Sequence, residues 1–187
     1  MSAHYLSKTD EELVALITNG ATDLYGILYD RYADKVYRKC LSFVKNEQIA
    51  QDNVQDIFLK VFFQLSKFKG KSRFSTWLYA ITYNYCVEYY RRNTRYTHVE
   101  VDERIELTED ETEEQELLKL RTEQLARALD KVAPEDKVIL LMKYQDNMSI
   151  KEIMEQLDIA ESAVKMRLAR ARKRVKAVIQ QQEKELV

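Results

Sequence analysis

The chain has 187 residues, 45% of them hydrophobic and 33% charged, with only three glycines and one proline. This composition lacks the turn residues that a β-rich fold requires and suits long amphipathic helices, so we expect an all-α fold of two small helical domains. No apolar run approaches the roughly 20 residues that cross a bilayer, and the N-terminal residues show no signal pattern. We therefore expect a soluble, cytoplasmic protein without direct membrane insertion.

The formal net charge of −1 hides an uneven distribution along the chain. Residues 1–95 carry 14 Lys and Arg against 10 Asp and Glu, residues 96–116 carry 1 against 10, and residues 117–187 carry 15 against 11. This pattern predicts two mildly basic domains, 1–95 and 117–187, joined by a flexible acidic linker, 96–116. Charge alone favours a solvated tether over a mimic of nucleic acid for this linker.

The first domain opens with a capping-box pattern, Thr9 followed by Glu12, which predicts a short helix that ends at Asn19-Gly20. Apolar residues at periods of three and four then predict a long core-facing helix over 21–44 and another over 52–66.

The helix over 52–66 has more apolar residues than one packing face needs. A second strip contains Gln55, Leu59 and Phe63 at successive spacings of four, beside Asp56. Another helix of the same domain could cover this strip, or the strip could be the docking site of a partner. Spacing alone does not separate the two interpretations.

A basic loop with interleaved aromatic residues follows and leads into a helix over 75–92, whose expected core stripe is Phe74, Leu78, Ile81 and Tyr85. Basic side chains neutralise phosphates, and exposed rings give unstacked bases a stacking surface, so this segment suits single-stranded nucleic acid. A structural role for most of the tyrosines stays open. The candidate contact residues are Lys67, Lys69, Lys71, Arg73, Phe74, Trp77, Tyr83, Asn84, Arg91 and Arg92.

The second domain contains the pattern of a helix-turn-helix. A second capping box, Ser149 with Glu152, opens one helix, a break follows at 158–160, and Glu161 begins another helix. The inward positions of this last helix are predicted to be Val164, Leu168, Ala171, Val175 and Val178. The same helix displays Lys165, Arg167, Arg170, Arg172, Lys173 and Arg174, as expected for a helix that lies in a DNA groove.

Enzymatic chemistry has little support in the residues. The phosphate-binding G-x-x-x-x-G-K motif and the zinc-binding H-E-x-x-H motif are both missing, and the chain has only two histidines. Cys40 and Cys86 lie inside helical patterns without further ligands at metal-binding spacing, so we interpret both as buried apolar residues. We expect no enzyme, no cofactor and no metal site.

Three passages together resemble the extracytoplasmic-function (ECF) group of the sigma-70 family. They are 24–32 with 52–62, then 74–81 with Asn84, Glu88, Arg91 and Arg92, and finally 148–153 through 163–172. Two positions differ from the family pattern in the turn of the helix-turn-helix: Asp158 stands where glycine is usual, and Ala160 where a capping serine or proline is common.

The resemblance implies a non-enzymatic subunit that binds core RNA polymerase and directs promoter-specific initiation. The first passage implies docking on the polymerase clamp helices through Gln55, Asp56, Leu59 and Phe63. The second implies melting and reading of the minus-10 element, and the third implies reading of the minus-35 element through Ser162, Lys165, Met166, Arg167, Arg170 and Lys173. It also implies contact with the polymerase flap tip, a linker that extends towards the RNA exit path, and an anti-sigma factor as a further partner.

The main alternative is a helix-turn-helix regulator that binds duplex promoter DNA without being a polymerase subunit. That alternative leaves the basic and aromatic segment from Phe68 to Arg92 unexplained. A purely structural helical adaptor is a further alternative.

Overall fold

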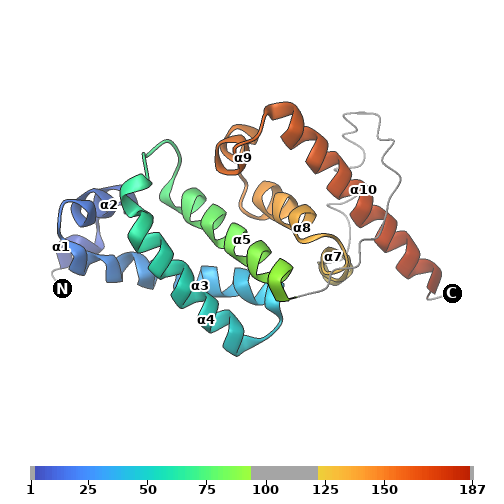
Figure 1. Ribbon diagram of the computed structural model, residues 1–187, viewed down its shortest axis with the longest axis horizontal. Helices are drawn as coiled ribbons and strands as arrows, with labels where there is room; N and C mark the ends of the chain where they lie inside the picture. The colour runs from blue at the N-terminus through green and yellow to red at the C-terminus, as the bar shows by residue number, and fades with distance from the viewer. Residues whose placement is uncertain (1–2, 94–121, 186–187) are drawn as a thin grey trace. The chain divides into compact units, whose positions relative to one another are not determined.

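The computed structural model describes residues 3–93 and 122–185, and the chain divides into two compact units, Met1–Asn93 and Thr94–Val187. Every regular element within the described ranges is helical, which confirms the expected all-α fold (Figure 1). The predicted acidic linker, 96–116, lies outside the described residues.

Unit 1 is built on three long helices that pack against one another. Its elements are α1 (Ala3–Leu6), α2 (Asp10–Thr18), a 3-10 turn (Thr22–Leu24), α3 (Tyr25–Val44), α4 (Glu47–Gln64), a second 3-10 turn (Leu65–Lys67) and α5 (Phe74–Asn93). The contacts join α3 to both α4 and α5, and α4 to α5. Figure 1 shows α2 beside the place where α4 ends and α5 begins.

Side-chain caps determine where two of these helices begin. The predicted capping box of α2 is confirmed: Glu12 N donates to Thr9 Oγ1 over 3.2 Å, and Thr9 N donates to Glu12 Oε2 over 2.8 Å. Helix α4 begins at Glu47, earlier than predicted, because Asn46 Oδ1 accepts a hydrogen bond from Ile49 N. The sequence pattern missed this first turn because its apolar stripe is clear only from Val54 onward.

The core of unit 1 is mainly apolar and draws residues from α2, α3, α4 and α5. Fully buried members include Leu13, Leu28, Val36, Ile57, Val61 and Leu78. Cys40 and Cys86 are buried free thiols whose sulfurs lie 3.9 Å apart, in agreement with their interpretation as apolar residues.

Unit 2 contains the helix-turn-helix. Its elements are α7 (Thr122–Leu129), α8 (Pro134–Leu140), a π turn (Leu141–Gln145), α9 (Ile150–Leu157) and α10 (Glu161–Glu185). Helix α10 packs against α7, α8 and α9. All five predicted inward positions of α10, from Val164 to Val178, are buried, so the predicted inward face is confirmed.

Two of the basic residues expected on the DNA-facing surface of α10 have structural contacts instead. Arg174 Nη1 donates to the nearly buried Asp136 carboxylate of α8 over 2.8 Å, and Arg172 Nη1 donates to the Tyr144 hydroxyl of the π turn over 3.2 Å. These contacts hold α10 against the preceding elements, which corrects the expectation that every basic residue of α10 faces outward.

None of the helices within the described ranges has the length and apolar character that a bilayer crossing needs.

Candidate functional site

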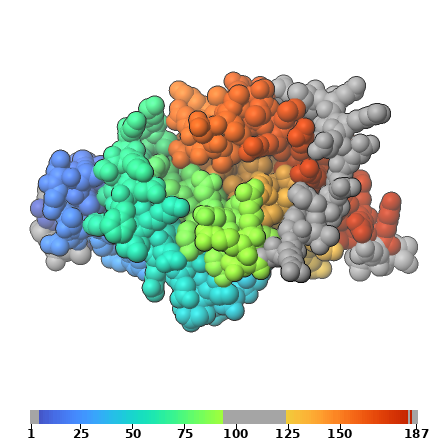
Figure 2. Space-filling model, in the orientation of Figure 1, coloured from blue at the N-terminus to red at the C-terminus, as the bar shows by residue number. Residues whose placement is uncertain are grey.

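The second apolar strip of α4 is open to solvent within unit 1. Leu59 is 57% exposed and Phe63 is 72% exposed, and Gln55 and Asp56 are exposed beside them. The other helices of unit 1 pack on the opposite face of α4, where Val54, Ile57 and Phe58 are buried. Within unit 1, therefore, the strip is not covered by a neighbouring helix, and Figure 2 shows α4 on the face turned towards the viewer.

Sequence reasoning missed one exposed aromatic residue of α3 that packs on α4. Tyr29 of α3 is 39% exposed, and its ring centroid lies 4.7 Å from that of Phe58 in α4. The Tyr25 ring also packs on α4: its centroid lies 5.0 Å from that of Phe62, and its hydroxyl donates to the carbonyl of Phe58. Only the packing of α3 on α4 brings these residues together.

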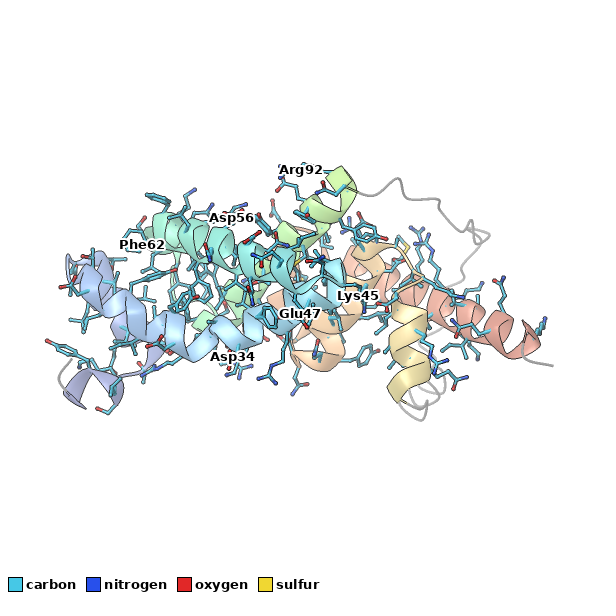
Figure 3. All side chains as sticks on the ribbon, turned by 90° about the horizontal axis from the view of Figure 1, so that it is seen from below. Asp34, Lys45, Glu47, Asp56, Phe62 and Arg92 are labelled. Carbon is cyan, nitrogen blue, oxygen red and sulfur yellow. The ribbon has the colours of Figure 1, made fainter. Side chains whose placement is uncertain are left out.

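Asp56 is the charged member of the strip, and α5 holds it in place. The Tyr85 hydroxyl donates to Asp56 Oδ2 over 2.6 Å. Burial, and next the hydrogen bond to this carboxylate, raise the pKa of Tyr85 well above its ordinary value, so the phenol keeps its proton further into the alkaline range. Figure 3 shows Asp56 in the middle of α4 and Phe62 nearer its C-terminal end.

The basic loop between α4 and α5 presents its charges to solvent. Lys67, Lys69, Lys71 and Arg73 are all exposed. Gly70 has a φ of 65°, in the left-handed region that glycine adopts at little cost, and it allows the turn between two of the lysines. Four cations on one short loop make a surface suited to phosphates.

Aromatic packing joins this loop to the start of α5. The Phe68 ring of the loop lies 5.8 Å from the Phe74 ring and 5.5 Å from the Trp77 ring, measured between centroids. Trp77 is half-buried and Asn84 is exposed, as are Arg91 and Arg92 at the far end of α5. These residues stay candidates for contact with DNA.

Two of the predicted contact residues are core residues instead. Phe74 and Tyr83 are fully buried, so the expectation that they touch nucleic acid is wrong for this structure. The Tyr83 hydroxyl accepts a hydrogen bond from Lys39 Nζ over 2.8 Å, and its ring contacts Phe43. A buried polar partner on α3 allows a tyrosine to point into the core, and spacing within α5 alone does not show this.

Lys39 also changes the interpretation of Tyr79. The Lys39 ammonium is nearly buried and lies 4.2 Å from the Tyr79 ring centroid and 4.8 Å from that of Tyr83. The amine therefore has cation–π contacts with two rings. This arrangement fixes the side of α5 that faces α3 and leaves the side with Trp77 and Asn84 for a ligand.

The helix-turn-helix has the predicted boundaries. Ser149 caps α9 and forms the predicted box with Glu152, whose amide lies 3.2 Å from Ser149 Oγ. Asp158 ends α9 in the left-handed region with a φ of 53°. Helix α10 then begins at Glu161, and Val164 N donates to the carbonyl of Ala160 as the first helical bond.

The predicted reading surface of α10 is largely exposed. Ser162, Lys165, Met166, Arg167 and Lys173 are exposed, and Arg170 is half-buried with its Nε buried and without a hydrogen-bond partner. Ser162, Met166 and Arg170 follow one another at spacings of four, opposite the buried Val164 and Leu168. This arrangement presents one polar and basic strip to a DNA groove.

Ala160→Ser is expected to stabilise unit 2. Residue 160 is the N-cap of α10, and a serine hydroxyl there can accept a hydrogen bond from an amide of the first turn, which alanine cannot do. The gain in the free energy of unfolding is expected to be about 1 kcal/mol. Thermal unfolding followed by circular dichroism measures it, with Ala163→Ser inside the same helix as the control, and an unchanged or lower midpoint would contradict the cap assignment.

The Sigma-70 region 2 family matches residues 28–96, and the Sigma-70, region 4 family matches residues 122–175. The first match includes the exposed strip of α4, the basic loop and α5, and the second includes the helix-turn-helix. Together they span well over half of the chain. The chain belongs to the sigma-70 family. Its function is that of a sigma factor, a subunit that binds RNA polymerase and directs promoter-specific transcription initiation.

Several curated relatives of this sigma factor are named as ECF sigma factors, in agreement with the resemblance. The chain is 27% identical over 172 residues to the ECF RNA polymerase sigma factor SigW of Bacillus subtilis. The alignment covers 83% of the chain and 89% of SigW. It is 29% identical over 182 residues to the ECF RNA polymerase sigma-E factor of Haemophilus influenzae, with 92% and 96% covered.

Solved structures show the same fold. CnrH, in complex with the cytosolic domain of CnrY, matches with a TM-score of 0.64 and 23% identity over 92% of this sigma factor and 98% of CnrH. RpoE of Bartonella quintana, in complex with the anti-sigma factor NepR, matches with a TM-score of 0.56 and 18% identity over 81% and 94% of the two chains.

Proposed function

We propose that unit 1 binds the clamp helices of core RNA polymerase and captures the melted minus-10 element, and that unit 2 reads the minus-35 element and contacts the flap tip. The observation that carries the proposal is the exposed strip of α4, with Leu59 and Phe63 open to solvent beside a basic and aromatic loop. A monomer rarely exposes large apolar side chains in a row without a partner for them.

The clamp contact is proposed for Gln55, Asp56, Leu59 and Phe63. Burial of the two apolar side chains supplies most of the binding free energy, because large apolar anchors dominate protein interfaces. Asp56 adds a charge that the Tyr85 hydroxyl already orients before binding, which lowers the entropic cost of forming an ion pair with a basic partner residue.

Tyr85→Phe tests this orientation of Asp56. The variant keeps the ring and removes only the hydroxyl that donates to the carboxylate, so we expect the affinity for core polymerase to fall by about three- to tenfold. A fluorescence titration of labelled protein with core polymerase measures the change. Tyr90→Phe, on the same helix, serves as the control, and equal affinities for both variants would contradict the role of Tyr85.

The minus-10 contact is proposed for Lys67, Lys69, Lys71, Arg73, Trp77, Asn84, Arg91 and Arg92. The loop cations attract the phosphates of the displaced strand, while Trp77 offers part of its ring to an unstacked base. Phe74 and Tyr83 are not part of this set, since both support the surface from within the core.

The minus-35 contact is proposed for the exposed strip of α10. Ser162, Lys165 and Met166 in its first turns face the base edges, while Arg167, Arg170 and Lys173 hold phosphates. The free protein binds duplex DNA only weakly, since each domain has only a small excess of basic residues. Contacts between polymerase and DNA therefore contribute much of the binding free energy.

The remaining parts of the proposal concern the segments and partners around these two contacts. The acidic linker, 96–116, acts as a tether directed towards the RNA exit path, and an anti-sigma factor covers one or both units when the protein is not in use. The chain catalyses no reaction of its own, uses no cofactor, and works in the cytoplasm with the polymerase.

Assembly with polymerase separates this proposal from the alternative of an autonomous DNA-binding regulator. The experiment compares binding of duplex promoter DNA by the free protein, by core polymerase and by their mixture. The proposal predicts specific binding only by the mixture. Tight specific binding by the free protein would favour the regulator instead.

A further inference from the structure

We propose that Glu11 is a positioning residue for capture of the melted minus-10 strand, because its carboxylate holds the start of α5 and, through it, the basic loop 67–73. The inference rests on the proposed function of that loop. Glu11 lies in α2, far along the chain from the residues that would touch DNA, and it acts through Phe74.

The residue that precedes α5 cannot cap the helix with its own side chain. The residue before the helix is Arg73, whose carbonyl accepts the helical hydrogen bond from Trp77 N. An arginine side chain has donors only, so Arg73 cannot accept from the unsatisfied amides of the first turn. Glu11 supplies the missing acceptor, since Phe74 N donates to Glu11 Oε1 over 3.0 Å. A carboxylate at this end of the helix is also favoured by the helix dipole.

The other acidic residues in the first turn of α2 have different partners. Glu12 completes the capping box with Thr9, within α2 itself. Asp10 accepts from Arg31 Nη1 over 2.6 Å and from the Tyr32 hydroxyl, and so anchors α2 to α3. Glu11, by contrast, accepts a hydrogen bond from the first amide of α5, and its removal leaves the contacts of Asp10 and Glu12 in place.

A second contact holds the same point of α5 through aromatic rings. The Tyr32 ring, oriented by Asp10, lies 5.6 Å from the Phe74 ring. Phe74 in turn contacts Phe68 of the loop and Trp77 of α5, which are 5.5 Å apart. The loop is therefore linked through Phe74 to α2 by the backbone amide and to α3 by the ring.

This linkage matters for strand capture because the loop cations and Trp77 must be in place before the strand arrives. A loop that is already ordered loses less conformational entropy on binding than a mobile loop does. Loss of the Glu11 hydrogen bond releases the first turn of α5 and raises that entropic cost. Contacts of α4 with polymerase do not depend on this hydrogen bond.

The test compares Glu11→Ala and Glu11→Gln, with Asp34→Ala as a control that removes an exposed carboxylate from the same unit. Two dissociation constants are measured for each variant. One is for core polymerase, and the other is for binding of assembled holoenzyme to a single-stranded non-template oligonucleotide that carries the minus-10 element of a transcribed promoter.

We expect Glu11→Ala to weaken oligonucleotide binding by about fivefold, with its affinity for core polymerase unchanged. Glu11→Gln should stay within about twofold of the parent protein, because its amide oxygen still accepts from Phe74 N. Asp34→Ala should match the parent protein in both measurements. Rescue by glutamine separates positioning from a general effect of removing charge near DNA.

Two results would overturn the inference alone: Glu11→Ala binds the oligonucleotide as tightly as Asp34→Ala does, or it loses affinity for core polymerase and oligonucleotide to the same extent. The first result removes the positioning role, and the second indicates a general loss of folding. If the parent holoenzyme shows no preference for the minus-10 strand over a scrambled strand, the proposed function of the loop fails, and the inference fails with it.

Discussion

Replacing either Leu59 or Phe63 by aspartate is expected to weaken assembly with core RNA polymerase strongly while unit 1 stays folded. Both side chains are more than half exposed, so the substitutions remove no core packing. In the complex, each aspartate would place a charge in an apolar contact. We expect each single variant to lose about 30-fold or more in affinity, as is usual for the central anchors of an interface.

Leu6→Asp is the matched control for this pair. Leu6 is also a leucine of unit 1 with an exposed side chain, at 61%, but it lies in α1, outside the strip. The control should bind core polymerase as the parent protein does, and all three variants should keep the parent's thermal midpoint. Full affinity in the Leu59 and Phe63 variants would contradict the docking site, and an equal loss in Leu6→Asp would show that the effect is not local.

Replacing Lys165 and Lys173 separately by alanine is expected to give two different losses of promoter binding. Both residues are exposed lysines of α10, so the change of charge is the same. Lys165 lies in the second turn of the recognition helix, where a side chain reaches base edges, and its surface ion pair with Glu161 at 3.2 Å contributes little to stability. Lys173 lies two turns further on, where the helix has left the bases.

Lys165→Ala should weaken holoenzyme binding by about tenfold on a promoter with an intact minus-35 element and have little effect on one with a scrambled element. Lys173→Ala should weaken binding to both promoters by a similar factor. It should also reduce the slope of log affinity against log salt concentration by about one, because one counterion fewer is released on binding. Titrations at several salt concentrations measure both effects. The same response from the two variants would contradict the division between base reading and phosphate holding.

Local signals in the sequence predicted much of the fold. The two capping boxes, at Thr9 and Ser149, mark helix starts that the structure confirms. The break at 158–160 and the inward stripe of α10 were also predicted, since both depend on residues within a few positions of each other. Signals of this kind act over one or two helical turns and do not need the tertiary fold.

Contacts between distant segments could not be predicted in this way. Tyr83 was assigned to the DNA surface because only its spacing in α5 was visible, and Lys39, its partner in the core, lies on another helix. The contact of Glu11 with Phe74 likewise joins residues far apart in the chain. The open strip of α4 was identified as a candidate, but whether another helix covers it within unit 1 depends on the packing of α3 and α5.

Transcription in vitro shows whether the protein directs RNA polymerase to promoters. Core RNA polymerase is incubated with a library of promoter sequences, with and without the protein, and the start sites are mapped by sequencing. We expect defined start sites only when the protein is present, with two separated sequence elements enriched upstream of them. An identical set of start sites with and without the protein would contradict it.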